Sequence, residues 1–182
     1  MNNNEYSLFS GGLKGSEAAF GNAAEKYGIN ETNFSFADHK LERDKNVAIL
    51  DDAELLRGQV SMEIVAETMG RKYHHAETIR KVIQVIFHMV NHGHQIFSVG
   101  WIQKDKTVKG GTGWGVELGK FFHRPVHVFD QETNKWFTWQ DNNWVEDTPV
   151  ITDKTFCGTG TRFLSDEGRK AINELFDRSF SK

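Results

Sequence analysis

The sequence has few of the residues that form disulfides or structural zinc sites in small proteins. It contains one cysteine, Cys157, among 182 residues. An internal disulfide and a cysteine-rich zinc site are therefore excluded, and we expect Cys157 to be buried as a small apolar side chain. The chain also has no internal repeat, low-complexity tract or linker-like stretch. These absences predict a single domain over residues 1–182 that is stabilised by an ordinary apolar core.

The chain also lacks a large excess of either charge sign and has no long apolar run. The formal net charge is −3 and no dense Lys/Arg block occurs, which argues against long nucleic acid as a partner. The longest apolar-rich segment, residues 82–90 (VIQVIFHMV), is too short and too polar to span a bilayer, so no membrane partner is expected. The first residues lack a basic and apolar leader, which favours a cytoplasmic protein.

Strand and helix patterns alternate along the chain. The expected strands cover residues 5–10, 33–37, 46–51, 95–100, 124–130 and 151–157, and an aromatic hairpin is expected near 135–145. The expected helices cover residues 15–28, 52–72 with a break near 57–58, 76–93, 111–122 and 165–180. This alternation predicts an α/β fold with a mostly parallel sheet that helices cover on its faces.

Three glycine-rich segments follow expected strands and precede expected helices. They are SGGLKGSE (10–17), KGGTGWGVE (109–117) and CGTGTRFL (157–164). One such segment is most simply a tight turn, because glycine is the usual residue for tight turns. Three at the carboxyl edge of one sheet suit an anion, since helix N-termini offer free N–H groups there. The sequence has no Walker loop and no GxGxxG, which disfavours a dinucleotide oxidoreductase.

The second segment resembles the GGxGTxxE signature of the LOG family of phosphoribohydrolases, and the first resembles the SGGxxGAD loop of the related SLOG proteins. Together with VFDQETNKWFTW and GTGTR, the pattern is similar to a SLOG branch of bacteria and tailed phages. This resemblance implies a Rossmann-like sheet, a nucleotide-derived ligand, no further cofactor and a homo-oligomer. The chain has Trp114 where LOG proteins have threonine, and Ser16–Glu17 where SLOG proteins usually have Ala-Asp.

The expected ligand-binding residues belong to these segments and their neighbours. Arg162 is expected to grip a phosphate and Trp101 or Trp114 to stack on a base. Asp130 either contacts a sugar or caps the turn that follows it. Glu117 either contacts a sugar or complements the dipole of its helix. The full set is Ser10, Gly11, Gly12, Lys14, Gly15, Trp101, Lys109, Gly110, Gly111, Thr112, Gly113, Trp114, Glu117, Asp130, Gly158, Thr159, Gly160, Thr161 and Arg162.

No metal site is expected, although histidines are frequent between residues 74 and 94. His88 and His92 are four residues apart on an expected helix, but HMVNH lacks the glutamate of HExxH. The histidines at positions 74, 75, 88, 92 and 94 are instead expected on a solvated helix face or at a subunit contact.

Two functions from different classes follow from these features. The preferred one is binding of a nucleotide or nucleotide-derived second messenger by a sensor or sequestering protein, with counter-defence in a phage as one setting that the resemblance implies. The alternative is an enzyme, a nucleoside-monophosphate N-glycosidase with Glu117 as its catalytic carboxylate. A structural interaction protein with vestigial glycine turns would leave the three segments unexplained.

Overall fold

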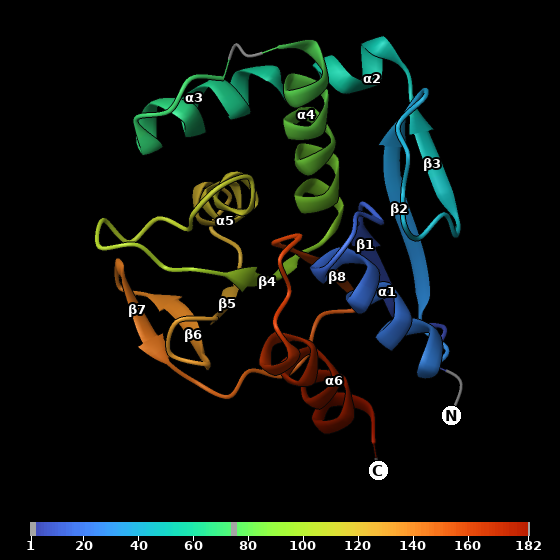
Figure 1. Ribbon diagram of the computed structural model, residues 1–182, viewed down its shortest axis with the longest axis vertical. Coiled ribbons are helices and arrows are strands. Elements are labelled where there is room, and N and C mark those ends of the chain that lie inside the picture. Colours follow the sequence, from blue (N-terminus) through green and yellow to red (C-terminus); the bar gives the residue numbers. More distant parts are fainter. Residues whose placement is uncertain (1–2, 74–75, 182) are drawn as a thin grey trace.

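The computed structural model describes residues 3–73 and 76–181. An eight-stranded sheet forms its centre in the order β3-β2-β1-β8-β4-β5-β6-β7 (Figure 1). The strands are β1 (Ser7–Ser10), β2 (Asn30–Phe36), β3 (Val47–Leu50), β4 (Gln95–Gly100), β5 (Val126–Asp130), β6 (Lys135–Gln140), β7 (Asn143–Glu146) and β8 (Thr155–Gly160). The first six strands in this order are parallel, and β6 and β7 pair antiparallel with their neighbours. The predicted α/β fold with a mostly parallel sheet is confirmed.

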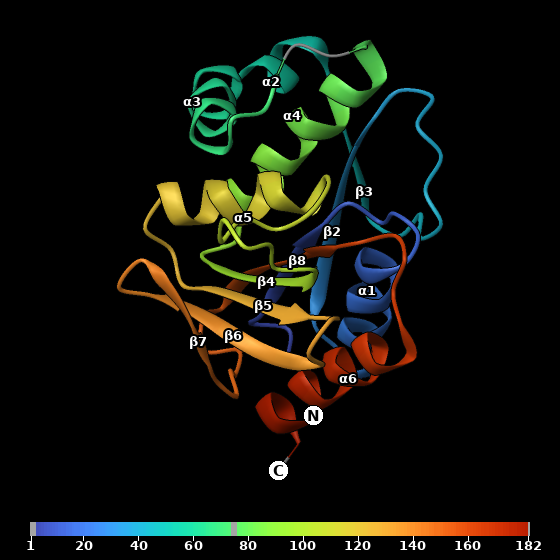
Figure 2. The same cartoon turned by 60° about the vertical axis from the view of Figure 1, so that its left-hand side comes forward.

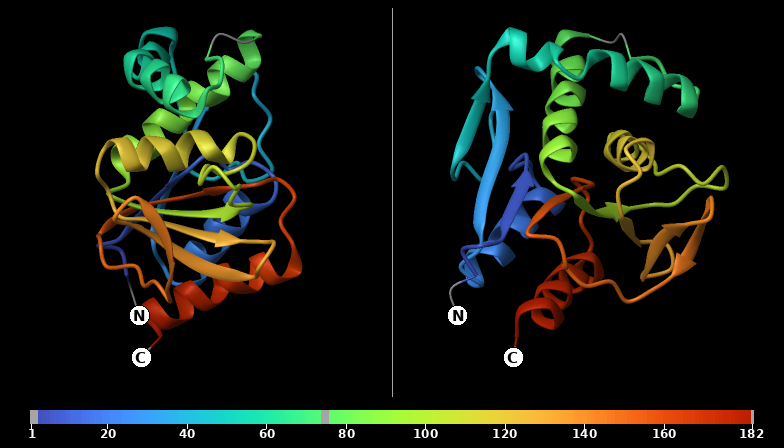
Figure 3. Two further views of the ribbon diagram at one scale, coloured as in Figure 1. Left: turned by 90° about the vertical axis from the view of Figure 1, so that its left-hand side faces the viewer. Right: turned by 180° about the vertical axis from the view of Figure 1, so that it is seen from behind.

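Helices cover both faces of this sheet (Figure 2). They are α1 (Ser16–Lys26), α2 (Asp52–Leu56), α3 (Gln59–Met69), α4 (Glu77–His92), α5 (Thr112–Phe121) and α6 (Asp166–Phe180). The pair α1 and α6 packs on one face, and α4 and α5 pack on the other, with α3 resting on α5 and α4 (Figure 3). None of the described helices has the length and apolar character needed to cross a bilayer.

The helix termini follow from local sequence. Ser165 caps α6 by accepting a hydrogen bond from the Gly168 N–H at 2.9 Å, as expected for serine before a helix. Asp51 and Glu54 form a reciprocal capping box at the start of α2. The predicted break between α2 and α3 falls at Gly58, where an added Cβ would lie 2.1 Å from the Phe87 ring. The glycine therefore lets the chain turn directly against α4.

The sheet separates two apolar clusters. Phe20, Phe97 and Phe156 pack between the sheet and the α1–α6 face, and Met89 and Ile96 belong to the cluster under α4 and α5. The predicted burial of Cys157 is confirmed, because the free thiol lies in the core.

Strand β8 differs from the prediction. The sequence suggested a strand over 151–157 followed by a glycine loop, but the strand is Thr155–Gly160. The prediction was wrong because Gly158 serves packing: an added Cβ there would lie 2.5 Å from the Phe20 ring. Since α6 begins only at Asp166, the GTGTR segment does not lead directly into a helix.

Candidate functional site

The three glycine segments meet at the carboxyl edge of the sheet. Strands β1, β8 and β4 are adjacent and parallel there. The chain leaves β1 toward β2 on one side and leaves β4 toward β5 on the other, which is where open α/β sheets bind ligands. A cavity of about 390 Å³, called the loop cavity below, opens at this place. The residues that line it are Gly11, Leu13, Glu17, Phe34, His39, Val82, Val85, Ile86, Met89, Trp101, Lys109, Gly110, Gly111, Thr112, Thr159, Gly160, Thr161, Arg162 and Phe163.

All three segments contribute predicted residues to this wall. The expected residues that line the cavity are Gly11, Trp101, Lys109, Gly110, Gly111, Thr112, Thr159, Gly160, Thr161 and Arg162. The expected residues outside its described lining are Ser10, Gly12, Lys14, Gly15, Gly113, Trp114, Glu117, Asp130 and Gly158.

The glycines of the first segment mainly allow neighbouring loops to approach each other. Gly12 has a φ of +67°, and its carbonyl accepts hydrogen bonds from the Glu42 and Arg43 N–H groups. Gly15 has a φ of +91°, and an added Cβ would lie 2.6 Å from the carbonyl oxygen of Arg162. The cavity itself is reached only by Gly11, which lies against Glu17.

The start of α1 is tied to the loop after β8. The backbone N–H and hydroxyl of Ser16 both donate to the Thr161 carbonyl, at 3.1 and 2.8 Å. This contact places Arg162 beside the N-terminus of α1, whereas the sequence suggested the N-terminus of α6. The Arg162 guanidinium is exposed and forms no ion pair with the described residues. Its charge is therefore available to a ligand.

The start of α5 offers the donors that an anion needs. Within residues 3–73 and 76–181, the N–H groups of Gly110, Gly111 and Thr112 donate to no protein acceptor. A Cβ added at either glycine would meet nothing within 4 Å, so the backbone is open to an approaching group. Thr112 is 7% exposed and lines the cavity, and Lys109 lies nearby with its Nζ 5.8 Å from the Trp101 ring centroid.

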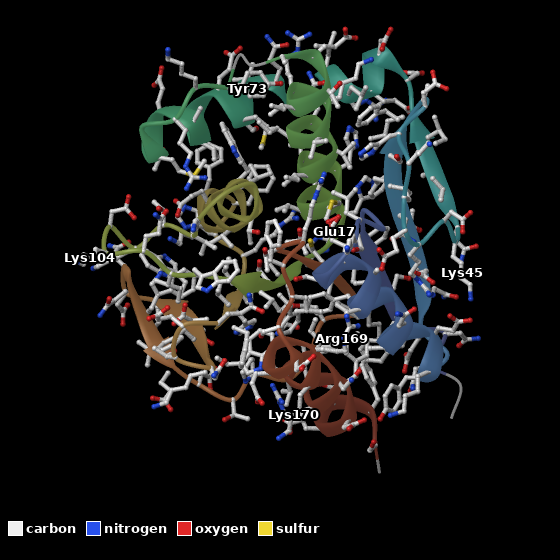
Figure 4. All side chains as sticks on the ribbon, in the orientation of Figure 1. Glu17, Lys45, Tyr73, Lys104, Arg169 and Lys170 are labelled. Carbon is white, nitrogen blue, oxygen red and sulfur yellow. The ribbon has the colours of Figure 1, made fainter. Side chains whose placement is uncertain are left out.

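Glu17 places a carboxyl group in the same cavity. The side chain is 4% exposed and has no ion pair among the described residues. Burial raises its pKa from 4.5 to about 8, against opposing hydrogen bonds from Leu13 and Thr159 and the charge of Arg162. Glu17 is therefore mostly a neutral carboxylic acid at pH 7. Figure 4 shows it at the start of α1, near the end of α4 that meets the sheet.

The opposite wall is apolar. Val82, Val85, Ile86 and Met89 of α4 line it together with Phe34. These apolar side chains recur at three- and four-residue spacing along α4, and part of that helix face lines the loop cavity.

His39 and Phe163 complete the rim. The His39 ring stacks on Phe36 with centroids 4.3 Å apart and pairs with the Ser35 hydroxyl at 3.2 Å. Burial and the Arg162 charge lower the pKa of His39, so the ring is neutral at pH 7. Phe163 is 80% exposed, which is unusual for so large an apolar side chain and leaves it free to cover an occupant.

Glu117 faces a different hollow. Its carboxylate pairs with Lys120 at 2.7 Å, and both side chains are nearly buried. The Lys120 Nζ also lies 3.7 Å from the Trp139 ring centroid and 4.8 Å from that of Trp144. This arrangement, called the α5 ion pair below, supports the hairpin of β6 and β7 and does not reach the loop cavity.

The remaining expected residues serve the fold. Asp130 accepts hydrogen bonds from the Ile102 N–H and from the Thr133 N–H and hydroxyl, which matches the turn-capping alternative. Trp114 is buried in the core beside Tyr73, with centroids 6.4 Å apart. Ser10 donates to the Gly158 carbonyl at 2.6 Å and ties β1 to β8, while Lys14 is exposed.

The histidines differ from one another. His88 is buried and its Nε2 lies 2.6 Å from the Glu54 carbonyl oxygen, so the expected solvated position is wrong for this residue. His74 and His75 lie outside the described residues. The described residues contain no group of three side chains suited to holding a metal ion.

Sequence reasoning missed Glu17, His39, Phe34 and Phe163 as cavity residues. Only Glu17 carried a signal, since an acid in the first turn after a glycine segment marks it for inspection. Comparisons of the chain with family models, with curated proteins and with solved structures return no match. The function is therefore argued from the site itself.

Proposed function

We propose that the protein binds a nucleotide or a nucleotide-derived second messenger in the loop cavity. The observation that carries this proposal is the row of unpaired N–H groups at Gly110, Gly111 and Thr112, with the free guanidinium of Arg162 on the same cavity. Such donors at a helix N-terminus favour phosphate. Arginine adds a bidentate partner for it.

The other half of the cavity suits a base. The apolar wall on α4 and the half-buried Trp101 offer faces on which a ring can lie. The volume of about 390 Å³ falls in the range of small-molecule sites, roughly 300–1,000 Å³. A ligand with one ring system and one anionic group therefore fits the chemistry of both halves.

Binding itself is the function that we favour, in a sensor or a sequestering protein. The resemblance to SLOG proteins suggests a homo-oligomer and a counter-defence setting, and these, like the cytoplasmic location, stay predictions. The N-glycosidase alternative assigned catalysis to Glu117, and the α5 ion pair that holds this residue away from the cavity gives that assignment no support.

The test separates binding from hydrolysis. The full chain is incubated with mononucleotides, cyclic dinucleotides and cyclic ADP-ribose isomers, separated from free ligand, denatured, and the released molecules are identified by mass spectrometry. An intact ligand released in stoichiometric amount supports binding. Free base with ribose phosphate supports the glycosidase and contradicts a purely binding role.

A matched pair of variants locates the site. Gly111→Phe fills the open backbone at the start of α5 and should abolish ligand retention, whereas Val60→Phe adds a ring at an exposed position of α3 and should keep it. Circular dichroism checks the fold of both. Retention by the Gly111 variant, or failure of every ligand to bind the parent chain, would overturn the proposal.

A further inference from the structure

We propose that Glu17 reads the base of the ligand, presenting its hydroxyl donor and carbonyl acceptor to the paired N–H donor and ring-nitrogen acceptor of adenine. This inference rests on the proposed function and names the class of base that the cavity selects. It also assigns a specificity role to a residue outside the phosphate-binding part of the site.

The position of Glu17 supports this role. It lies in the first turn of α1 on the cavity wall, which also includes the apolar side chains of Val85, Ile86 and Met89. A ring against that wall would bring its polar edge to the one carboxyl group that lines the cavity among the described residues. A base whose edge found no polar partner in such a place would lose hydrogen bonds to water without replacement.

The protonation state decides which edge fits. A neutral carboxyl group has one O–H donor and one acceptor, as a glutamine amide does, and the glutamine amide pairs bidentately with adenine. An ionised carboxylate only accepts, so it loses the bond to the adenine ring nitrogen. Guanine instead offers two neighbouring donors, N1–H and N2–H, which an ionised carboxylate can accept together. Adenine binding should therefore weaken as Glu17 ionises, while guanine binding should not.

Few other groups near Glu17 change charge over the same pH range. Burial lowers the pKa of His39, which keeps that ring neutral from pH 7 upward. Burial raises the pKa of the Cys157 thiol on β8, so it stays neutral as well. Lys109 faces the cavity from the segment before α5, and α4 contributes apolar side chains to the wall.

The test measures the dissociation constants of AMP and GMP for the full chain by calorimetry at pH 7 and pH 9. With a Glu17 pKa of about 8, the AMP dissociation constant should rise about tenfold between these values, whereas that of GMP should not rise. Glu17→Gln keeps donor and acceptor without titrating. It should bind AMP about as tightly as the parent does at pH 7 and lose the pH dependence. Glu17→Leu should weaken AMP binding at both pH values, and Glu167→Gln, at an exposed position in the first turn of α6, is the control.

The outcomes separate the two proposals. The role of Glu17 would be overturned if Glu17→Gln and Glu17→Leu bound AMP equally tightly, or if Glu17→Gln kept the pH dependence of AMP binding. Either result would leave nucleotide binding intact. Binding of other panel ligands but of neither AMP nor GMP would do the same. Failure of every nucleotide would overturn both proposals. Urea unfolding of each variant shows whether it is folded, and AMP binding by Glu17→Gln keeps the test decisive if Glu17→Leu is unstable.

Discussion

The two ends of α5 differ in whether their polar groups have a protein partner. At its start, three backbone donors and the nearby Arg162 have no protein partner among the described residues. Further along the same helix, the Glu117 carboxylate pairs with Lys120, which lies against two tryptophan rings. Gly110, Gly111 and Arg162 are exposed, so their donors are open to a ligand, whereas Glu117 and Lys120 satisfy each other where little water reaches them.

The comparison shows why a matching motif is a weak guide to a catalytic residue. Glu117 has the spacing of the LOG glutamate, yet its charge is used within the protein. Glu17 lacks that motif, but it lies in the cavity without an ion pair. Whether a carboxyl group faces a ligand cavity or a protein counter-ion is decided by the tertiary structure, which the motif does not report.

The largest expected effect comes from breaking the α5 ion pair. Glu117→Gln leaves a nearly buried ammonium without its counter-ion, and we expect a loss of about 2–4 kcal/mol in the free energy of unfolding. Urea denaturation measures it. Adding Lys120→Met should recover most of the loss. Ligand retention should stay unchanged in both variants, and a selective loss of retention would place Glu117 back in the site.

A second substitution removes the positive charge of Arg162 from the loop cavity. Arg162→Gln should weaken binding of a mononucleotide by about 10- to 100-fold, because a charge-assisted hydrogen bond contributes roughly 1.5–3 kcal/mol. The corresponding free nucleoside should bind as before. Calorimetry compares the two, with Arg169→Gln on α6 as the exposed control (Figure 4). Equal losses for nucleotide and nucleoside would contradict the phosphate role.

Two glycines allow a comparison between a position that is tightly packed in the core and one with free space around it. Gly158→Ala should cost about 1–3 kcal/mol of stability, since its Cβ would lie 2.5 Å from the buried Phe20 ring. Gly111→Ala should stay within about 0.5 kcal/mol, because its φ is −59° and its Cβ would meet nothing within 4 Å. Thermal unfolding of both tests the contrast, and similar losses would refute it.

The last prediction concerns the pH dependence of stability that Glu17 causes without ligand. Its folded pKa of about 8 exceeds the ordinary value of 4.5, so the folded state binds more protons between these values. The free energy of unfolding should therefore fall as the pH rises from about 4.5 to 8. Glu17→Gln should remove this decline and gain on the order of 1–3 kcal/mol at pH 7. A parent and variant with parallel pH profiles would contradict the assignment.

Much of the fold could be predicted because local patterns and packing agree. The apolar spacing in α4, the serine before α6 and the glycine between α2 and α3 each specify an element boundary. Strand β8 could not be placed well, because Gly158 and Gly160 look like turn residues although they lie in the strand. Their small size is required by Phe20, Val99 and Ser16, which come from other parts of the chain.

The site was predictable in its backbone and less so in its side chains. Strand-to-helix segments of a parallel sheet meet at one edge whatever their sequence, so the three glycine segments could be expected together. Which side chains face the cavity depends on helix rotation and on competing partners. Trp114 and Asp130 lie near this edge, yet the core takes one and a turn takes the other.

The open backbone at Gly110 and Gly111 has a consequence for how such a protein can change over generations. Neither position supports the core, but the φ of +71° at Gly110 favours glycine, so only substitutions at Gly111 carry little folding penalty. Gly111, with its negative φ, can accept side chains that reshape the anion site directly. The chain can thus acquire a new ligand preference by mutation at this point while its sheet and helices remain intact.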